Sequence, residues 1–292
     1  MATQEKVKKP LVLVTGANGQ LGKELQQLAD QWTQFEFLFL SREDLPIHHF
    51  ELVRNFFKAT HPSYLINAAA YTAVDKAEHE KELAFQVNAE AVGVLAAICR
   101  EQHCRFLHIS TDYVFDGTAR QPYLETATTN PQGVYGSSKL EGERQAMQFN
   151  PDSIIIRTSW VYSSFGKNFV KTILRLLKEK PEVRVVDDQV GSPTFAADLA
   201  AAILQIVSAK NWISGIYNYS NQGEISWYTF AKAIADLTHN STPIHPITTA
   251  EFPTPAKRPA WSVLDCTKIS TVYGISILPW KDSLEKCLKQ LD

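Results

Sequence analysis

The stretch LVLVTGANGQLG, residues 11–22, decides the fold of this 292-residue chain. Its apolar run Leu11–Thr15 predicts a buried strand, and the following glycines lead into a helix that we expect to continue to Asp30. Glycine allows positive φ and lets the backbone approach a ligand closely. A helix N-terminus offers unpaired N–H groups to a pyrophosphate. Strand, turn and helix in this order predict a phosphate-binding turn made by Gly16, Gly19 and Gly22.

Short apolar runs and helical patterns alternate through the first 180 residues. Strands are predicted at 35–40, 64–67, 105–110 and 153–157, and helices at 48–59, 80–100, 135–149 and 168–178. This alternation is typical of an α/β fold, a Rossmann-type doubly wound parallel sheet. Residues 1–180 are therefore expected to form mainly an NAD(P)-binding domain, with some later segments returning to it.

The pattern changes after about Lys180, where prolines gather and strands become sparse. Strands are predicted at 183–186 and 215–219, and helices at 195–206 and 226–237. The helix near 196–208 is compatible with either part of the chain. We expect residues 181–292 to form mainly a smaller α/β substrate-binding lobe.

The composition excludes several classes of protein. The 29 Lys and Arg and 31 Asp and Glu give a formal net charge of −2, which argues against an electrostatic grip on nucleic acid or an anionic membrane. The four cysteines lack the spacing of a disulfide framework or a zinc site, so a reduced, cytoplasmic chain is expected. The N-terminal MATQEKVKKP has no apolar signal segment, and no apolar run approaches the roughly 18 residues of a membrane helix.

The end of the second predicted strand bears on the choice of cofactor. Arg42 lies 20 residues after Gly22, where an arginine accommodates the 2′-phosphate of NADPH and an acidic residue binds the ribose of NADH. Arg42 favours NADPH, and NADH stays open because Glu43 and Asp44 follow; a solvated surface arginine is the plain alternative. Ligands of such sheets bind at the carboxyl ends of the strands, so the cleft should also be lined by Ala68, Ala69 and Ala70.

Tyr135 and Lys139 stand four residues apart, which places them on one face of a helix. A phenol with its ordinary pKa near 10 transfers protons poorly at neutral pH, and a nearby ammonium group should lower that pKa. The ammonium can also hold the nicotinamide ribose. Thr111, at the end of the fourth predicted strand, can hydrogen-bond the substrate oxygen. These three residues form the predicted catalytic set.

At these motifs the chain resembles the extended short-chain dehydrogenase/reductase superfamily and, more narrowly, the dTDP-4-dehydrorhamnose reductase family. The resemblance covers nearly the whole chain and rests on residues 16–22, 67–78, 110–115, 135–139, 157–162 and 255–259. The first and fourth segments are shared across the superfamily, and the others narrow the match. The resemblance implies reduction of the C4 ketone of dTDP-4-dehydro-6-deoxy-L-mannose to dTDP-L-rhamnose, the last step of dTDP-L-rhamnose biosynthesis.

The resemblance also assigns roles to single residues. It implies cofactor contacts by Gly19, Gln20, Leu21, Asp44, Leu45, Ala69 and Ala70. It implies nucleotide-sugar contacts by Thr72, Val74, Thr111, Asp112, Tyr135 and Trp160, with Arg258 on the pyrophosphate. Members are often homodimers, some with an interface Mg²⁺ held by carboxylates. The C-terminal KQLD lacks the glutamate expected there, so the sequence leaves a metal ion undecided.

Other interpretations stay open at this stage. A nucleotide-sugar epimerase, a dehydratase or another 4-ketoreductase would share the fold and the Tyr–Lys pair, although dehydratases need an Asp-Glu pair where this chain has Asp112-Tyr113. The non-catalytic regulatory subunit of methionine adenosyltransferase also resembles this family. For single residues, Trp160 can be a core aromatic, Arg258 a solvated loop charge and His108 a core histidine.

Overall fold

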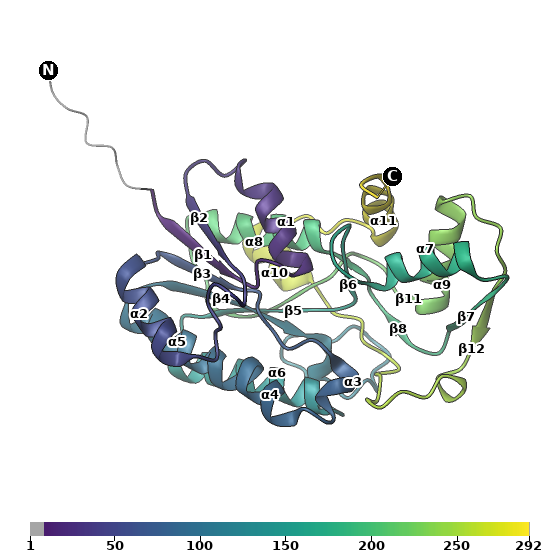
Figure 1. Ribbon diagram of the computed structural model, residues 1–292, viewed down its shortest axis with the longest axis horizontal. Coiled ribbons are helices and arrows are strands. Elements are labelled where there is room, and N and C mark those ends of the chain that lie inside the picture. Colours follow the sequence, from purple (N-terminus) through teal and green to yellow (C-terminus); the bar gives the residue numbers. More distant parts are fainter. Residues whose placement is uncertain (1–8, 292) are drawn as a thin grey trace, which may run out of the picture.

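Six parallel strands form the central sheet of the computed structural model, which describes residues 9–291 (Figure 1). Their spatial order is β10 (Gly215–Tyr219), β5 (Ile154–Thr158), β4 (Arg105–Thr111), β3 (Tyr64–Asn67), β1 (Leu11–Thr15) and β2 (Glu36–Leu40). The order of the strands reverses between β1 and β3, as in a doubly wound sheet. The predicted α/β class with a parallel sheet is confirmed. The N-terminal segment, where no signal peptide was expected, lies largely outside the described residues.

Helices cover both faces of this sheet, which is why its strands are apolar on both sides. On one face, Val12 and Val14 belong to a core shared with α1 (Gln20–Ala29), α8 (Ala196–Ser208) and α10 (Thr267–Tyr273). On the other face, Leu13 belongs to a second core shared with α2 (Phe50–Thr60), α5 (Ala91–Glu101) and α6 (Val134–Phe149). Alternate residues of one strand therefore enter different cores.

One long helical segment comprises α4 (Lys81–Phe85), the π-helical turn η1 (Gln86–Glu90) and α5. By length and composition this segment, 81–101, could cross a membrane. Its side chains Val92, Leu95 and Cys99 are fully buried in the second core, which accounts for their apolar character.

The smaller lobe has a core of its own, built around α7 (Phe169–Glu179), α9 (Trp227–Leu237) and α11 (Trp280–Lys289) (Figure 1). Between α7 and α9 the chain returns to the main sheet, where α8 packs against α1 and β10 pairs with β5. The shorter elements are α3 (Val74–Ala77), η2 (Asp112–Val114), β6 (Val161–Tyr162), β7 (Val183–Val186), β8 (Val190–Gly191), β9 (Thr194–Phe195), β11 (Ile225–Ser226), β12 (Ile244–Ile247) and η3 (Thr249–Glu251).

A buried ion pair joins β5 to α6. Arg157 lies 2.6 Å from Glu143, and each side chain is only 3% exposed. Glu143 also accepts a hydrogen bond from the hydroxyl of Ser110 on β4. Both charges are removed from water, so loss of either side chain would leave the other charge buried without a partner.

We expect Arg157→Ala to lower the free energy of unfolding by about 3–5 kcal/mol, because the Glu143 carboxylate is left buried without its partner. Urea unfolding followed by circular dichroism measures the change. The matched control is Arg175→Ala, which breaks an exposed pair with Glu179 and should cost about 0.2–1 kcal/mol. Equal losses in the two variants would contradict this account.

Candidate active site

The glycine turn after β1 is in direct contact with the end of β3. Gly16 has φ +76°, and a Cβ placed on it would lie 2.6 Å from the carbonyl carbon of Ala68 and from the nitrogen of Ala69. A Cβ on Gly22 would collide with the carbonyl oxygen of Gly16. The turn therefore requires glycine at these two positions, which sequence spacing alone had indicated.

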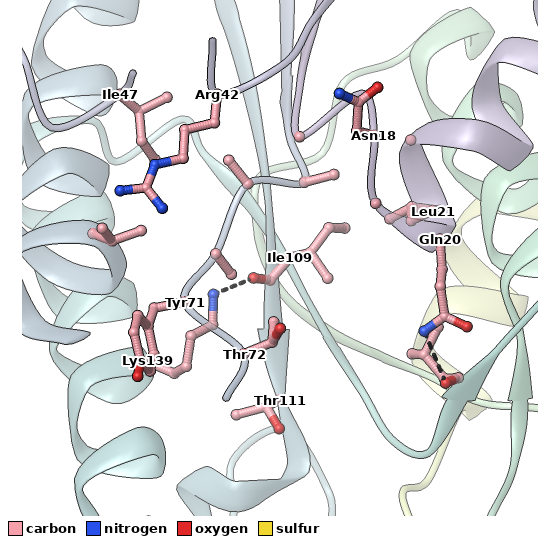
Figure 2. A pocket seen from close by; sticks show the side chains of 18 of the residues that line it. Asn18, Gln20, Leu21, Arg42, Ile47, Tyr71, Thr72, Ile109, Thr111 and Lys139 are labelled. Atoms are coloured by element: carbon pink, nitrogen blue, oxygen red, sulfur yellow. Dashed lines mark hydrogen bonds between the residues drawn. The ribbon is translucent and has the colours of Figure 1, made fainter. Parts of the chain in front are cut away.

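Helix α1 begins at Gln20 with its first N–H groups available to an anion. Its N-cap residue is Gly19, which offers no side-chain cap, and the first turn contains no acidic residue. The Gln20 side chain donates to the carbonyl of Val161 at 3.3 Å (Figure 2). It also accepts from Asn168 at 2.9 Å, and the two contacts hold the start of α1 against the segment before α7. A glycine cradle below free N–H groups fits the pyrophosphate of a dinucleotide.

A cleft of about 790 Å³ opens at the carboxyl ends of the strands beside this turn. Figure 2 shows how side chains from both sides of the switch between β1 and β3 surround it. Fifteen of the predicted site residues line this cleft, namely Gly16, Gly19, Gln20, Leu21, Gly22, Arg42, Leu45, Ala68, Ala69, Ala70, Thr72, Val74, Thr111, Tyr135 and Lys139.

Arg42 and Asp44 follow β2 but take different positions. Arg42 lines the cleft, whereas Asp44 is not among its lining residues. The Asp44 carboxylate accepts the backbone N–H of Ser41 at 2.9 Å, and hydrogen bonds from Ser41 hold the pKa of this carboxyl below its usual range. In this structure Asp44 stabilises the turn that presents Arg42.

The Tyr135–Lys139 pair lies on α6, one helical turn apart, as the spacing indicated. The Lys139 ammonium nitrogen donates to the carbonyl oxygen of Ile109 at 2.6 Å (Figure 2). It also lies 3.2 Å from Nε2 of His108. Burial lowers the pKa of Lys139 to about 7, against the opposing effect of the Glu143 carboxylate. The side chain is 2% exposed and still reaches the wall of the cleft.

The prediction that Lys139 lowers the pKa of Tyr135 is wrong for this structure. Burial raises the pKa of Tyr135 to about 12; the nearby Thr111 hydroxyl opposes this effect, and the Asp112 carboxylate adds to it. Lys139 is engaged by Ile109 and His108 at the end of β4. The phenol of Tyr135 is thus protonated at neutral pH, which suits a proton donor.

Thr111 ends β4, and its hydroxyl points into a short polar chain. It donates to the carboxylate of Asp112 at 2.9 Å and accepts the backbone N–H of Tyr113 at 3.3 Å. Asp112 is buried, and burial raises its pKa to about 7. Asp112 lies behind Thr111 and does not line the cleft itself.

Three of the residues expected at the nucleotide-sugar lie outside the lining of this cleft, namely Asp112, Trp160 and Arg258. The ring of Trp160 stacks on Trp227 of α9, with centroids 3.5 Å apart and planes 8° from parallel. The guanidinium of Arg258 binds the carboxylate of Asp75 with two hydrogen bonds, one of 2.7 Å, and this contact lowers the pKa of Asp75. Their contacts with a substrate stay predictions.

Some cleft residues receive no role from the sequence, although Asn18, Tyr71 and Tyr113 lie inside motif segments. The sequence does not predict Asn18, Ile47, His48, Tyr71, Tyr113 or Lys167, which all line the cleft. His108 was assigned to the core, and it is fully buried, but it also contacts Lys139. Alternation along β4 was the available signal, because it places His108 and Ser110 on the face covered by α6.

The interface Mg²⁺ stays undecided, because such a site would be shared between two copies of the chain. Within 9–291 there is no group of three His, Cys, Asp or Glu side chains that could hold a metal ion. The carboxylate of Asp292 lies outside that range.

A parallel sheet, a glycine turn and a Tyr–Lys helix around one cleft define a dinucleotide-binding oxidoreductase of the short-chain dehydrogenase/reductase class. The chain belongs to the family of the RmlD substrate binding domain, whose family model matches residues 10–292. It is 42% identical over 284 residues to the dTDP-4-dehydrorhamnose reductase of Aggregatibacter actinomycetemcomitans, a match that covers 94% of this chain and 97% of that protein.

Solved structures agree with this assignment. A dTDP-4-dehydrorhamnose reductase from Clostridium acetobutylicum has a TM-score of 0.92 and 42% identity, covering 96% of this chain and 99% of that one. The dTDP-4-dehydrorhamnose reductase of Bacillus anthracis in complex with NADP has a TM-score of 0.93 and 36% identity, covering 97% and 100%. The family resemblance predicted from the sequence is confirmed, and the chain is an NAD(P)-dependent oxidoreductase.

We expect Gly22→Ala to weaken NADPH binding at least tenfold, because the added methyl group collides with the carbonyl of Gly16 and distorts the turn. Fluorescence titration with NADPH measures the dissociation constant. The comparison variant is Gly19→Ala, whose added Cβ would lie 3.2 Å from the same oxygen and should have a smaller effect. The idea fails if Gly22→Ala binds NADPH as tightly as the unmodified protein.

Proposed function

We propose that this enzyme reduces the C4 ketone of dTDP-4-dehydro-6-deoxy-L-mannose to dTDP-L-rhamnose with NADPH, the last step of dTDP-L-rhamnose biosynthesis. The observation that carries the proposal is one cleft in which Thr111, Tyr135 and Lys139 lie beside the glycine turn. The names of relatives about 40% identical over nearly their full length support the substrate. Cytoplasmic location and a homodimer belong to the same proposal, as properties that the resemblance implies.

The chain's own groups supply orientation and a proton. NADPH, when bound, supplies the hydride for C4 of the sugar. The Thr111 hydroxyl rotates from Asp112 toward the ketone oxygen and holds it by a hydrogen bond. The Tyr135 phenol, protonated because burial raises its pKa, donates its proton to the developing alkoxide. Lys139 lines the same cleft and would hold the nicotinamide ribose.

The remaining substrate contacts extend from this centre toward the smaller lobe. Thr72 and Val74 line the cleft next to the catalytic set, and Asp112 supports Thr111 from behind. Trp160, stacked on Trp227, would present an aromatic face to the nucleotide. Arg258, partly neutralised by Asp75, would take the pyrophosphate by exchanging that partner for a phosphate.

Tyr135→Phe should lower kcat by about 10²–10⁴-fold, because the variant lacks the donated proton, while NADPH still binds. Loss of the absorbance of reduced nicotinamide on addition of the 4-keto sugar measures turnover. Tyr123→Phe is the control, since this buried hydroxyl binds Asp116 away from the cleft. Near-normal turnover of Tyr135→Phe would reject the proton-donor role, and no NADPH oxidation by the unmodified enzyme would reject the reductase.

Arg42→Ala should raise the KM for NADPH about tenfold or more and leave the KM for NADH nearly unchanged, because a charge-assisted contact to the 2′-phosphate is lost. Arg42 lines the cleft at the position after β2 where this phosphate is bound in such folds. Initial rates with the two cofactors measure the ratio. An unchanged ratio of the two KM values would show that Arg42 has no part in cofactor choice.

A further inference from the structure

A row of buried polar side chains crosses three strands beneath the cleft. Thr15 of β1, Asn67 of β3 and His108 of β4 are register neighbours across the sheet. Their exposed fractions are 1%, 0% and 0%. Two residues earlier in each strand, the corresponding positions are Leu13, Leu65 and Phe106, all in the second core. An apolar layer is thus replaced by a polar one directly below Lys139.

The row is continuously hydrogen-bonded. The Thr15 hydroxyl donates to Oδ1 of Asn67 at 2.6 Å, and Nδ2 of Asn67 lies 3.0 Å from Nδ1 of His108. Nε2 of His108 lies 3.2 Å from Nζ of Lys139. Burial holds the pKa of His108 well below its usual range, so the ring is neutral and carries a single proton.

That single proton links the row to the charge of Lys139. When Nδ1 of His108 accepts from Asn67, the ring proton is on Nε2 and points at Nζ, which matches a neutral amine. A half-turn of the Asn67 amide presents its oxygen instead, moves the ring proton to Nδ1 and leaves Nε2 free to accept from an ammonium. The donors and acceptors along the row therefore exchange roles between the neutral amine and the ammonium of Lys139.

We propose that Thr15, Asn67 and His108 fix the orientation and the charge of Lys139, with His108 as a positioning residue for the reaction proposed above. The carbonyl of Ile109 and the ring of His108 take two of the three ammonium donors, which leaves the third for the cleft. Of the other charged or titratable groups around Lys139, Glu143 is bound by Arg157, and Tyr135 is protonated. His108 is thus the neighbour whose proton position follows the charge of the amine.

The first test is the pH dependence of NADPH binding, without sugar. An ammonium in the cleft attracts the anionic cofactor, so affinity should fall as the pH rises through the pKa of Lys139, about 7. His108→Phe keeps a ring but removes the acceptor, so the ammonium is less stable and this midpoint should move down by about one pH unit. His108→Gln supplies an acceptor again and should restore the midpoint most of the way.

Phe106→Leu is the matched control, because it changes the same face of β4 one layer below the row and should lower stability without moving the midpoint. His48 and Asp112 also titrate near the cleft. The variants leave both residues unchanged, so the difference in binding midpoint between variants reports the titration of Lys139. A midpoint in His108→Phe equal to that of the unmodified enzyme would overturn the proposal. Failure to reduce the sugar, with this shift intact, would overturn only the proposed substrate.

Nitrogen NMR of the imidazole rings tests the row in the unmodified protein, and a variant serves only to assign the signals. The chain has eight histidines, and loss of one set of signals in His108→Gln assigns His108. We expect a neutral ring whose proton moves from Nδ1 to Nε2 as the pH rises through about 7, the pKa of Lys139. If the His108 tautomer stays the same across this pH range, the hydrogen bonds of the row do not follow the charge of Lys139, and the proposal is rejected.

Discussion

The site depends on one close contact between backbones, that of Gly16 against the exit of β3. It exists because Gly16 has no side chain, and the positive φ of that residue turns the chain over Ala68 and Ala69 toward α1. With the turn in place, the N–H groups of α1 and the ends of β3 and β4 face the same volume. A dinucleotide bound over this contact would reach both the N-terminus of α1 and the catalytic set of Thr111, Tyr135 and Lys139.

Buried charged side chains fix the position of α6, which carries two of the catalytic residues, and their removal from water costs free energy. Glu143 and Arg157 neutralise each other between α6 and β5, and one turn earlier on the same helix face Lys139 meets His108. The helix that carries the phenol of Tyr135 is thus fastened to β4 and β5 by polar groups rather than by apolar packing alone. Such contacts define one position of a helix more sharply than aliphatic side chains do, because hydrogen bonds have preferred directions.

Local patterns in the sequence were sufficient for the alternation of strands and helices, for the glycine turn and for the Tyr–Lys pair, because each depends on neighbours within a few residues. The contact between Arg258 and Asp75 joins residues 183 apart, and the Trp160–Trp227 stack joins two lobes, so periodicity could not indicate either. The acidity of Tyr135 was misjudged for a related reason: spacing places Lys139 on the right helix face, but burial and the acceptors at the end of β4 determine its effect.

The place of β10 in the sheet has a consequence for how the protein is made. Residues 215–219 pair with β5, residues 154–158, so the nascent chain must lengthen by about 60 residues before that neighbour emerges. At a ribosome speed of about 5–20 residues per second, the interval is roughly 3–12 s. During this time β5, which begins with three isoleucines, lacks its neighbour at the edge of the sheet. Uncovered edges of this kind favour aggregation and are bound by chaperones.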